Sequence, residues 1–498
     1  MLVTSRWPAW AEVAAPVGLG VWSREESVRF LAARTGYQDV VRLGELAELV
    51  GDLPLAVQEA AAYLEQTGED LDVYLELLRA RAREVFALAK VQGGGEADRR
   101  RVATVWTVSL ERLRAEEPAA EDLLSLLAFL APQVPRDLPT TQPRVLPPSL
   151  RATVTDRLVY NRLLAALGRY SLVHLGPRQV GMHRLVQLVV RARMGERAEA
   201  EWAARAVDLI RAGFPETTTE VAVWPVCQRL LPHLLAVTDH AQRRSIRQES
   251  VGWLLDRAAS YLRARGQYRQ AEPLARQALT LTEAAHGPDH PDTAARRNVL
   301  GLVLHDLGHY DEARQQFEHA LRIGEATLGP DHPDTAIRHN NLGTVLHALG
   351  HYDEARQQFE HALRIGEATL GPDHPDIGTW RNNLGLALHA SGRLEEARQH
   401  LEQALRIDEA AHGPDHPDTA NRRNNLANVL HDQGRYDKAR QQLEHALRIT
   451  EATLGPDHPD TAIMRGNLAQ VLRCLGHLDE ARQQLEHALL ISEASLGP

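Results

Sequence analysis

The pattern of apolar and polar positions repeats with a fixed period in the second half of the chain. Leu342, Leu346 and Leu349 lie at i, i+4 and i+7, which places them on one face of a helix. The loop sequence Gly-Pro-Asp-His-Pro-Asp occurs five times at 42-residue intervals, starting at Gly287, Gly329, Gly371, Gly413 and Gly455. Such a period predicts a solenoid, in which each unit buries its apolar face against its neighbours.

The first half of the chain is also predicted to be helical. Ser23 and Glu26 form a capping box that opens a helix ending near Arg34. Further helices are expected at about residues 39–50, 55–66 and 70–88, followed by a Gly-rich linker at 92–96. Residues 1–22 contain two short strand patterns, which predict a piece of a larger sheet domain.

Residues 100–195 are expected to form a compact unit. Helical patterns are found at residues 104–114, 118–131 and 154–167, with a Pro-rich loop at 132–148. Two alternating segments, 171–175 and 179–183, flank Gly176-Pro177-Arg178 and predict a hairpin. A helical bundle closed by a hairpin is the winged-helix arrangement. Residues 196–250 are predicted to be a helical linker.

Composition adds a fold class and excludes several kinds of partner. The 498 residues are 44% apolar and 24% charged with 5% aromatic, typical of a soluble, mainly α protein of several domains. The net charge of −10 makes nucleic acid an improbable partner. We expect no membrane span, because the longest apolar run, Leu123 to Val134, is too short. Cys227 and Cys474 lie in different predicted domains, which fits a reducing cytoplasm.

The repeated unit resembles the tetratricopeptide repeat. The resemblance lies in Asn341-Leu-Gly-Thr-Val-Leu-His-Ala-Leu-Gly350-His-Tyr-Asp-Glu-Ala355, followed by Phe359. The 42-residue length and the Leu-Gly-Pro-Asp-His-Pro loop resemble the kinesin light chain variety. The resemblance to the tetratricopeptide repeat covers residues 251–498, as six repeats. The resemblance implies a right-handed α-α superhelix with a concave groove that holds extended peptides.

The upstream half is similar to the later part of the NB-ARC type of STAND nucleotide-binding switches. The matching segments are Leu2-Val-Thr-Ser-Arg6, Gly51-Asp-Leu-Pro54-Leu-Ala56 and Met182-His183-Arg184. The resemblance implies a remnant of the nucleotide-binding domain at residues 1–22, a helical domain at 23–92 and the winged-helix domain at 100–195. It further implies that Arg6, Pro54 and His183 face a bound nucleotide.

The phosphate-binding loop of that family is missing from the sequence. It needs Gly-x-x-x-x-Gly-Lys-[Ser/Thr], whereas Lys90 and Lys438, the only lysines, do not follow a glycine. We therefore expect no enzyme activity and no cofactor, with ATP or ADP bound only if the missing domain is supplied. The chain is interpreted as the C-terminal part of a longer switch or as a degenerate relative of one.

The candidate binding residues lie on the first helix of each repeat, away from the Leu stripe. They are two rows at fixed spacing: Asn298, Asn340, Asn382 and Asn424, and His305, His347, His389 and His431. Asn amides can donate to and accept from a peptide backbone, so we predict that these rows form the groove floor. The alternative is that they repeat only because the repeats were copied. For Asn341, Asn383 and Asn425, a hydrogen bond to the adjacent repeat is expected instead.

The loop histidines are predicted to serve structure. Asp331, His332 and Asp334 are near enough to share a metal ion, but Gly329-Pro330 ends one helix and Asp334-Thr335 can cap the next. No metal is therefore expected. The first functional hypothesis is a cytoplasmic scaffold for a protein or peptide partner in signalling or regulation. The second is part of an ATP/ADP-dependent switch, which would allow an oligomer.

Overall fold

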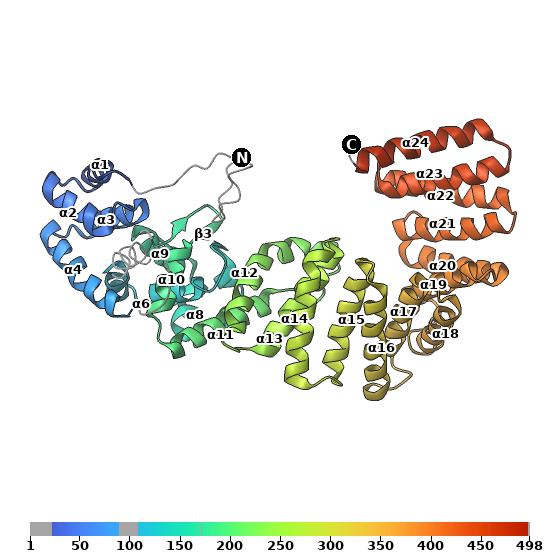
Figure 1. The fold of residues 1–498 in the computed structure, drawn as a ribbon, viewed down its shortest axis with the longest axis horizontal. Coiled ribbons are helices and arrows are strands. Elements are labelled where there is room, and N and C mark those ends of the chain that lie inside the picture. The colour runs from blue at the N-terminus through green and yellow to red at the C-terminus, as the bar shows by residue number, and fades with distance from the viewer. Residues whose placement is uncertain (1–21, 89–107, 171, 497–498) are drawn as a thin grey trace. The chain divides into compact units, whose positions relative to one another are not determined.

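The computed structural model describes residues 22–88, 108–170 and 172–496 and is mainly α-helical, as predicted (Figure 1). It divides into two compact halves, an N-terminal half ending at Leu254 and a C-terminal half beginning at Leu255. The finer domain boundaries stay predictions. Arg6, the remainder of the 1–22 remnant up to residue 21, and the 92–96 linker lie outside the described residues.

Four helices open the N-terminal half, namely α1 (Arg24–Thr35), α2 (Val40–Val50), α3 (Pro54–Thr67) and α4 (Leu71–Leu88). The predicted capping box is present, because the Ser23 side chain accepts from Glu26 N while the Glu26 carboxylate accepts from Ser23 N. Gly51 ends α2 with φ of 74°, and Pro54 is the first residue of α3. The predicted helices of this segment are therefore confirmed.

A small sheet and several helices follow. They are α6 (Pro118–Leu127), β1 (Gln133–Pro135), α7 (Leu138–Thr141), η2 (Pro143–Val145), α8 (Pro148–Thr155), α9 (Arg157–Arg169), β2 (His174–Leu175), β3 (Gln179–Gly181) and α10 (Arg184–Arg193). The antiparallel strands have the order β1-β3-β2. The predicted hairpin is confirmed, whereas the winged-helix assignment stays a prediction.

Several predicted boundaries in this region were wrong. The helix expected at 118–131 ends at Leu127, and strand β1 forms within the segment predicted to be loop, because it pairs with β3. Asp156 separates α8 from α9 and caps α9 by accepting from Leu158 N and Val159 N. A strand of three residues has no periodicity of its own, so only its partner strand reveals it.

One apolar helical segment of the N-terminal half is longer than the run from Leu123 to Val134 that the sequence pattern singled out. Helix α11 (Glu196–Gly213) is followed by η3 (Val221–Val223) and α12 (Trp224–Gln242). Val221–Gln242 is the one helical segment of the described residues that is long and apolar enough to cross a membrane. Two polar contacts join it to other parts of the N-terminal half: His233 accepts from Ala131 N at 3.2 Å, and Arg229 pairs with Asp137 at 2.9 Å.

The second part of the chain is a row of antiparallel helix pairs (Figure 1). Six repeats are formed by α13 (Gln248–Ala264) with α14 (Tyr268–His286), α15 (Pro291–Asp306) with α16 (Tyr310–Thr327), α17 (Pro333–Ala348) with α18 (Tyr352–Thr369), α19 (Pro375–Ala390) with α20 (Leu394–His412), α21 (Pro417–Asp432) with α22 (Tyr436–Thr453), and α23 (Pro459–Cys474) with α24 (Leu478–Leu496). From the second repeat on, each second helix packs on the first helix of its own repeat, and helices α14, α16, α18, α20 and α22 also pack on the first helix of the next repeat.

The repeated loop is explained by helix capping, with one correction. The Gly of each loop has a positive φ, for example 98° at Gly329, which a side chain would strain. The histidine is the N-cap residue, because Nδ1 of His332 accepts from Asp334 N at 3.1 Å and Pro333 begins the helix. The Asp334-Thr335 cap was therefore wrong: Thr335 instead donates to the Gly329 carbonyl at 2.9 Å.

Where the two helices of a repeat pack together, a small residue on the first helix faces a large side chain on the second. A Cβ at Gly343 would lie 2.7 Å from the ring of Phe359, and one at Gly301 would lie 2.6 Å from Phe317. In the last two repeats the same positions hold smaller pairs, Ala427 with Leu443 and Ala469 with Leu485. In the fourth repeat Gly385 instead lies beside a leucine, with a built Cβ 2.7 Å from Leu401. A phenylalanine at this position therefore comes with a glycine, whereas a leucine comes with either a glycine or an alanine.

The contact between successive repeats contains one unusual charge. Arg422 on α21 pairs with the buried Asp408 of α20, with Nε 2.8 Å from Oδ2. The equivalent pair in the third repeat is Arg338 with Gly324, so the carboxylate is replaced by a hydrogen. Arg338 is 6% exposed, forms no ion pair within the described residues, and its Nη1 has no hydrogen-bond partner. Burial lowers the pKa of Arg338.

Candidate functional site

The first helices of the repeats line the inner side of the array. The neighbouring first helices α15, α17, α19, α21 and α23 contact one another, and they do so more closely than neighbouring second helices. When stacked units approach more closely on one side, the stack curves toward that side. The surface of the first helices is therefore the concave one, on which the Asn and His rows were predicted.

A ladder of asparagine amides joins five of these helices. The first row, Asn298, Asn340, Asn382 and Asn424, accepts through Oδ1 from the Nδ2 of the second row, Asn341, Asn383, Asn425 and Asn467. The four donor–acceptor distances are 2.9, 3.0, 2.9 and 2.8 Å. Each bond links residues of adjacent repeats, so the predicted inter-repeat hydrogen bond of the second row is confirmed.

The ladder determines what the first row can offer to a ligand. Because Oδ1 of each first-row residue already accepts from the next repeat, the groups that remain are the Nδ2 amide, which can only donate, and the second lone pair of Oδ1. Asn382 also donates to Asn383 at 3.3 Å. Asn340 is 9% exposed and Asn382 is 3% exposed, whereas Asn298 and Asn424 are half-buried. The first row therefore offers a narrow strip of donors, and its role as groove floor stays a prediction.

The histidine row lies where the two helices of each repeat meet. The rings of His305, His347 and His431 lie 5.3–5.5 Å from the tyrosine that begins the second helix of the same repeat. His389 has no such tyrosine and instead pairs through Nε2 with Oδ2 of Asp432 at 2.7 Å. Burial lowers the pKa of His347, which keeps that ring neutral. This row borders the Asn ladder.

A row of ion pairs between consecutive repeats was not predicted from the sequence. One arginine in each of four first helices pairs with a glutamate of the preceding second helix; the pairs are Arg297–Glu283, Arg381–Glu367, Arg423–Glu409 and Arg465–Glu451. In the third repeat His339 takes this place, 3.6 Å from Glu325. The constant 14-residue separation of base and acid was the signal that could have revealed it. These ion pairs link consecutive repeats.

Within the described residues, one group has three close metal-ligating side chains. The ligand atoms of His412, His416 and Asp418 lie within 4.8 Å of one another. His416 uses Nδ1 to accept from Asp418 N at 3.2 Å, as its role as helix cap requires. Capping accounts for this arrangement, which recurs with His286, His290 and Asp292 in an earlier loop. The expectation of no metal stays a prediction.

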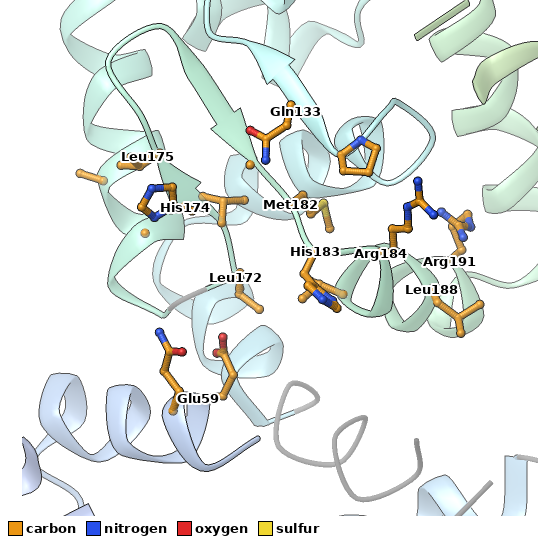
Figure 2. Close-up of a pocket in the computed structure, with 17 residues that line it drawn as sticks. Glu59, Gln133, Leu172, His174, Leu175, Met182, His183, Arg184, Leu188 and Arg191 are labelled. Carbon is orange, nitrogen blue, oxygen red and sulfur yellow. The ribbon is translucent and has the colours of Figure 1, made fainter. Parts of the chain in front are cut away.

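The residues suggested by the nucleotide-switch resemblance are only partly brought together. His183 follows β3 and lines a cleft of about 1300 Å³ with Glu59 of α3, Arg184 and Arg191 (Figure 2). Burial lowers the pKa of His183. Pro54, at the start of α3, does not line this cleft. The proposed contacts of Pro54 and His183 with a nucleotide stay predictions.

Comparison with known proteins agrees with the repeat geometry. The tetratricopeptide repeat family matches residues 250–326, 298–368, 339–410, 376–452 and 423–494. Residues 109–199 match a family described as Domain of unknown function (DUF7779). A Nucleotide-binding leucine-rich repeat (NLR)-like protein of Hyaloscypha variabilis is 30% identical over 265 residues, which is 51% of this chain and 25% of that protein. The chain thus spans about a quarter of this relative.

Two solved structures are similar to parts of the chain. Kinesin light chain nearly identical TPR-like repeats from Podosopora anserina are 26% identical over 41% of this chain and 98% of theirs, with a TM-score of 0.37. A STAND protein with a tetratricopeptide repeat sensor from Pyrococcus horikoshii is 12% identical over 96% of this chain and 74% of its own, with a TM-score of 0.40. From the family match and the helix pairs, we conclude that this chain is a tetratricopeptide repeat protein.

Proposed function

We propose that the array is a scaffold that holds an extended segment of a partner protein on the concave surface of its first helices. The observation that supports this most is the Asn ladder, which aligns the first-row amides of four successive repeats. An extended peptide has unpaired backbone carbonyls along its length. The Nδ2 groups of the first row can donate to these carbonyls without selecting side chains, whereas the bordering histidines can contribute sequence preference.

The proposed site centres on the third to fifth repeats. Gly466 stands where the sixth repeat would place a first-row Asn, and Arg473 where it would place a row histidine. The second-row residue Asn467 is retained and closes the ladder on Asn424. The sixth repeat therefore supports the row without extending it.

The first prediction concerns loss of peptide binding. A peptide is selected from a random library displayed on phage, and its affinity for the full chain is measured by fluorescence anisotropy. Replacement of Asn340, Asn382 and Asn424 together by Ala is expected to weaken binding at least about tenfold, since each lost hydrogen bond costs about 0.5–1.5 kcal/mol. Circular dichroism checks that helicity is retained.

A matched variant separates recognition from support of the ladder. Replacing Asn383, Asn425 and Asn467 by Ala removes the same three ladder bonds but keeps the first-row side chains. We expect this variant to bind the peptide much more tightly than the first-row variant. Equal losses would show that the ladder only supports the fold, and failure to select any peptide would count against the scaffold proposal itself.

A second candidate function is the C-terminal part of an ATP/ADP-dependent switch. Support comes from the cleft at His183, where Arg184 and Arg191 supply positive charge, and from the NLR-like relative, whose name includes nucleotide binding. The family's phosphate-binding loop is missing from the sequence, as Lys90 and Lys438 show. The scaffold is therefore the preferred proposal.

An ADP titration distinguishes the two functions. With no lysine-containing phosphate loop, the chain alone is expected to show no saturable ADP binding by isothermal titration calorimetry. Tight binding that is lost in His183→Ala would favour the switch instead. Arg178→Ala, at the tip of the hairpin and outside that cleft, is the control for a nonspecific effect of charge.

A further inference from the structure

The exposed cysteine Cys474 ends a line of polar side chains that crosses three successive first helices. It is the last residue of α23, and its Sγ lies 3.5 Å from Nε2 of His431 on α21. Nδ1 of His431 lies 2.9 Å from Oδ1 of Asp432, and Oδ2 of Asp432 lies 2.7 Å from Nε2 of His389. The thiol, the imidazole and the carboxylate are therefore joined by two consecutive close contacts.

Asp432 determines which ring nitrogen of His431 carries the proton. Burial raises the pKa of Asp432, but its hydrogen bonds with His431 and His389 outweigh this and lower the pKa overall. The carboxylate is consequently ionised at neutral pH and accepts from Nδ1 of His431. This interaction leaves the lone pair of Nε2 facing the thiol, as a base for that proton requires.

The arrangement is specific to one place in the array. The position of Cys474 is occupied in the four preceding repeats by Asp306, Ala348, Ala390 and Asp432. The other cysteine, Cys227, is fully buried in α12 and has no such neighbour among the described side chains. His477 is near in sequence but pairs with Glu480 at 2.9 Å instead.

We propose that Cys474 is a redox-sensitive thiol that reacts with hydroperoxides, with His431 as the base and Asp432 as the residue that positions it. The thiol proton passes to Nε2 of His431, and the sulfur then donates an electron pair to one peroxide oxygen. The S–O bond forms as the O–O bond breaks, and the departing hydroxide or alkoxide takes the proton from His431. Cys474 is oxidised to a sulfenic acid and the peroxide is reduced to water or alcohol.

The test measures sulfenic acid at each cysteine of the reduced full chain. The protein is treated with hydrogen peroxide in the presence of dimedone, and the labelled cysteines are quantified by mass spectrometry over time. We expect Cys474 to be labelled and Cys227 to remain unlabelled. His431→Asn is expected to slow labelling of Cys474 about tenfold, because asparagine offers no base within reach of the Sγ proton.

Three further variants make the result decisive. Asp432→Asn, whose exposed side chain can change without disturbing the core, should also slow labelling. His477→Asn is the matched control and should leave the rate unchanged, whereas Cys474→Ser should abolish the labelled peptide. If Cys474 is labelled as fast in His431→Asn and Asp432→Asn as in the unaltered chain, or is not labelled at all, the proposal is wrong.

Discussion

Replacing Arg338 by Met should stabilise the protein by roughly 1–4 kcal/mol, the range seen when buried ion pairs are replaced by apolar residues, because here the desolvated charge is removed without loss of a pair. Arg338 is almost fully buried and, in the described part of the chain, has no carboxylate partner. Methionine already occupies the equivalent position in the sixth repeat as Met464, which is 3% exposed. The readouts are the midpoint of thermal unfolding and the hydrogen-exchange protection of α16 and α17.

The same substitution two repeats later should have the opposite effect. Arg422→Met removes the partner of Asp408, which is 2% exposed, and breaking a buried pair in this way costs about 3–5 kcal/mol. Gly324→Asp provides a second check, because it supplies Arg338 with the carboxylate that Arg422 has. The three atoms nearest to a built Cβ at Gly324 all belong to the Arg338 side chain, at 2.5–3.2 Å, so this side chain has to shift to accept the new carboxylate. If Arg338→Met and Arg422→Met destabilise alike, Arg338 is paired in solution and our interpretation is wrong.

Replacing Gly343 by Ala should destabilise the third repeat, although alanine is the better helix former. The added methyl would lie 2.7–3.0 Å from three atoms of the Phe359 ring, which is 1% exposed and enclosed on all sides. Such overpacking costs about 1–3 kcal/mol. The gain in helix propensity is only about 1 kcal/mol. Urea unfolding followed by circular dichroism should show a net loss of stability.

A second substitution tests whether contact with the Phe359 ring causes the loss of stability in Gly343→Ala. Combining Gly343→Ala with Phe359→Leu recreates the Ala427–Leu443 pair of the fifth repeat. The double variant should therefore be more stable than the two single effects predict, with a coupling of about 0.5–3 kcal/mol. Gly466→Ala is the matched control: nothing lies within 4 Å of its added Cβ, so it should be stabilising. A destabilising Gly466→Ala would argue that the glycines serve another purpose.

Several conclusions followed from sequence because their physical causes are local. The 42-residue period, the apolar stripe of Leu342 and Leu346, and the positive-φ glycines such as Gly329 predicted helix pairs and the loops between them. Each depends on interactions within one turn or one loop. The limits of the short helices in the N-terminal half were less accurate, as β1 shows, because pairing with a distant strand determines them.

Only part of the candidate site could be predicted from the sequence. The Asn and His rows were found from their spacing, which places them on one helix face. The Arg381–Glu367 type of pair was missed because its members lie on different helices, and the helix cap was assigned to Asp334-Thr335 although His332 forms it. The predicted 1–22 remnant, with Arg6, lies almost wholly outside the described residues.

The amino-acid sequence by itself determined the repeat length, the helix pairs, the concave rows and the missing phosphate loop, since all of these are periodic or local properties. Only the tertiary structure decided which atoms remain free. The stacking of adjacent repeats engages Oδ1 of Asn340 and Asn382 in the ladder, leaves Arg338 without an ion-pair partner among the residues that the structure describes, and brings Cys474 beside His431. These contacts join residues about 40 positions apart, whose distances are set by how neighbouring helices pack.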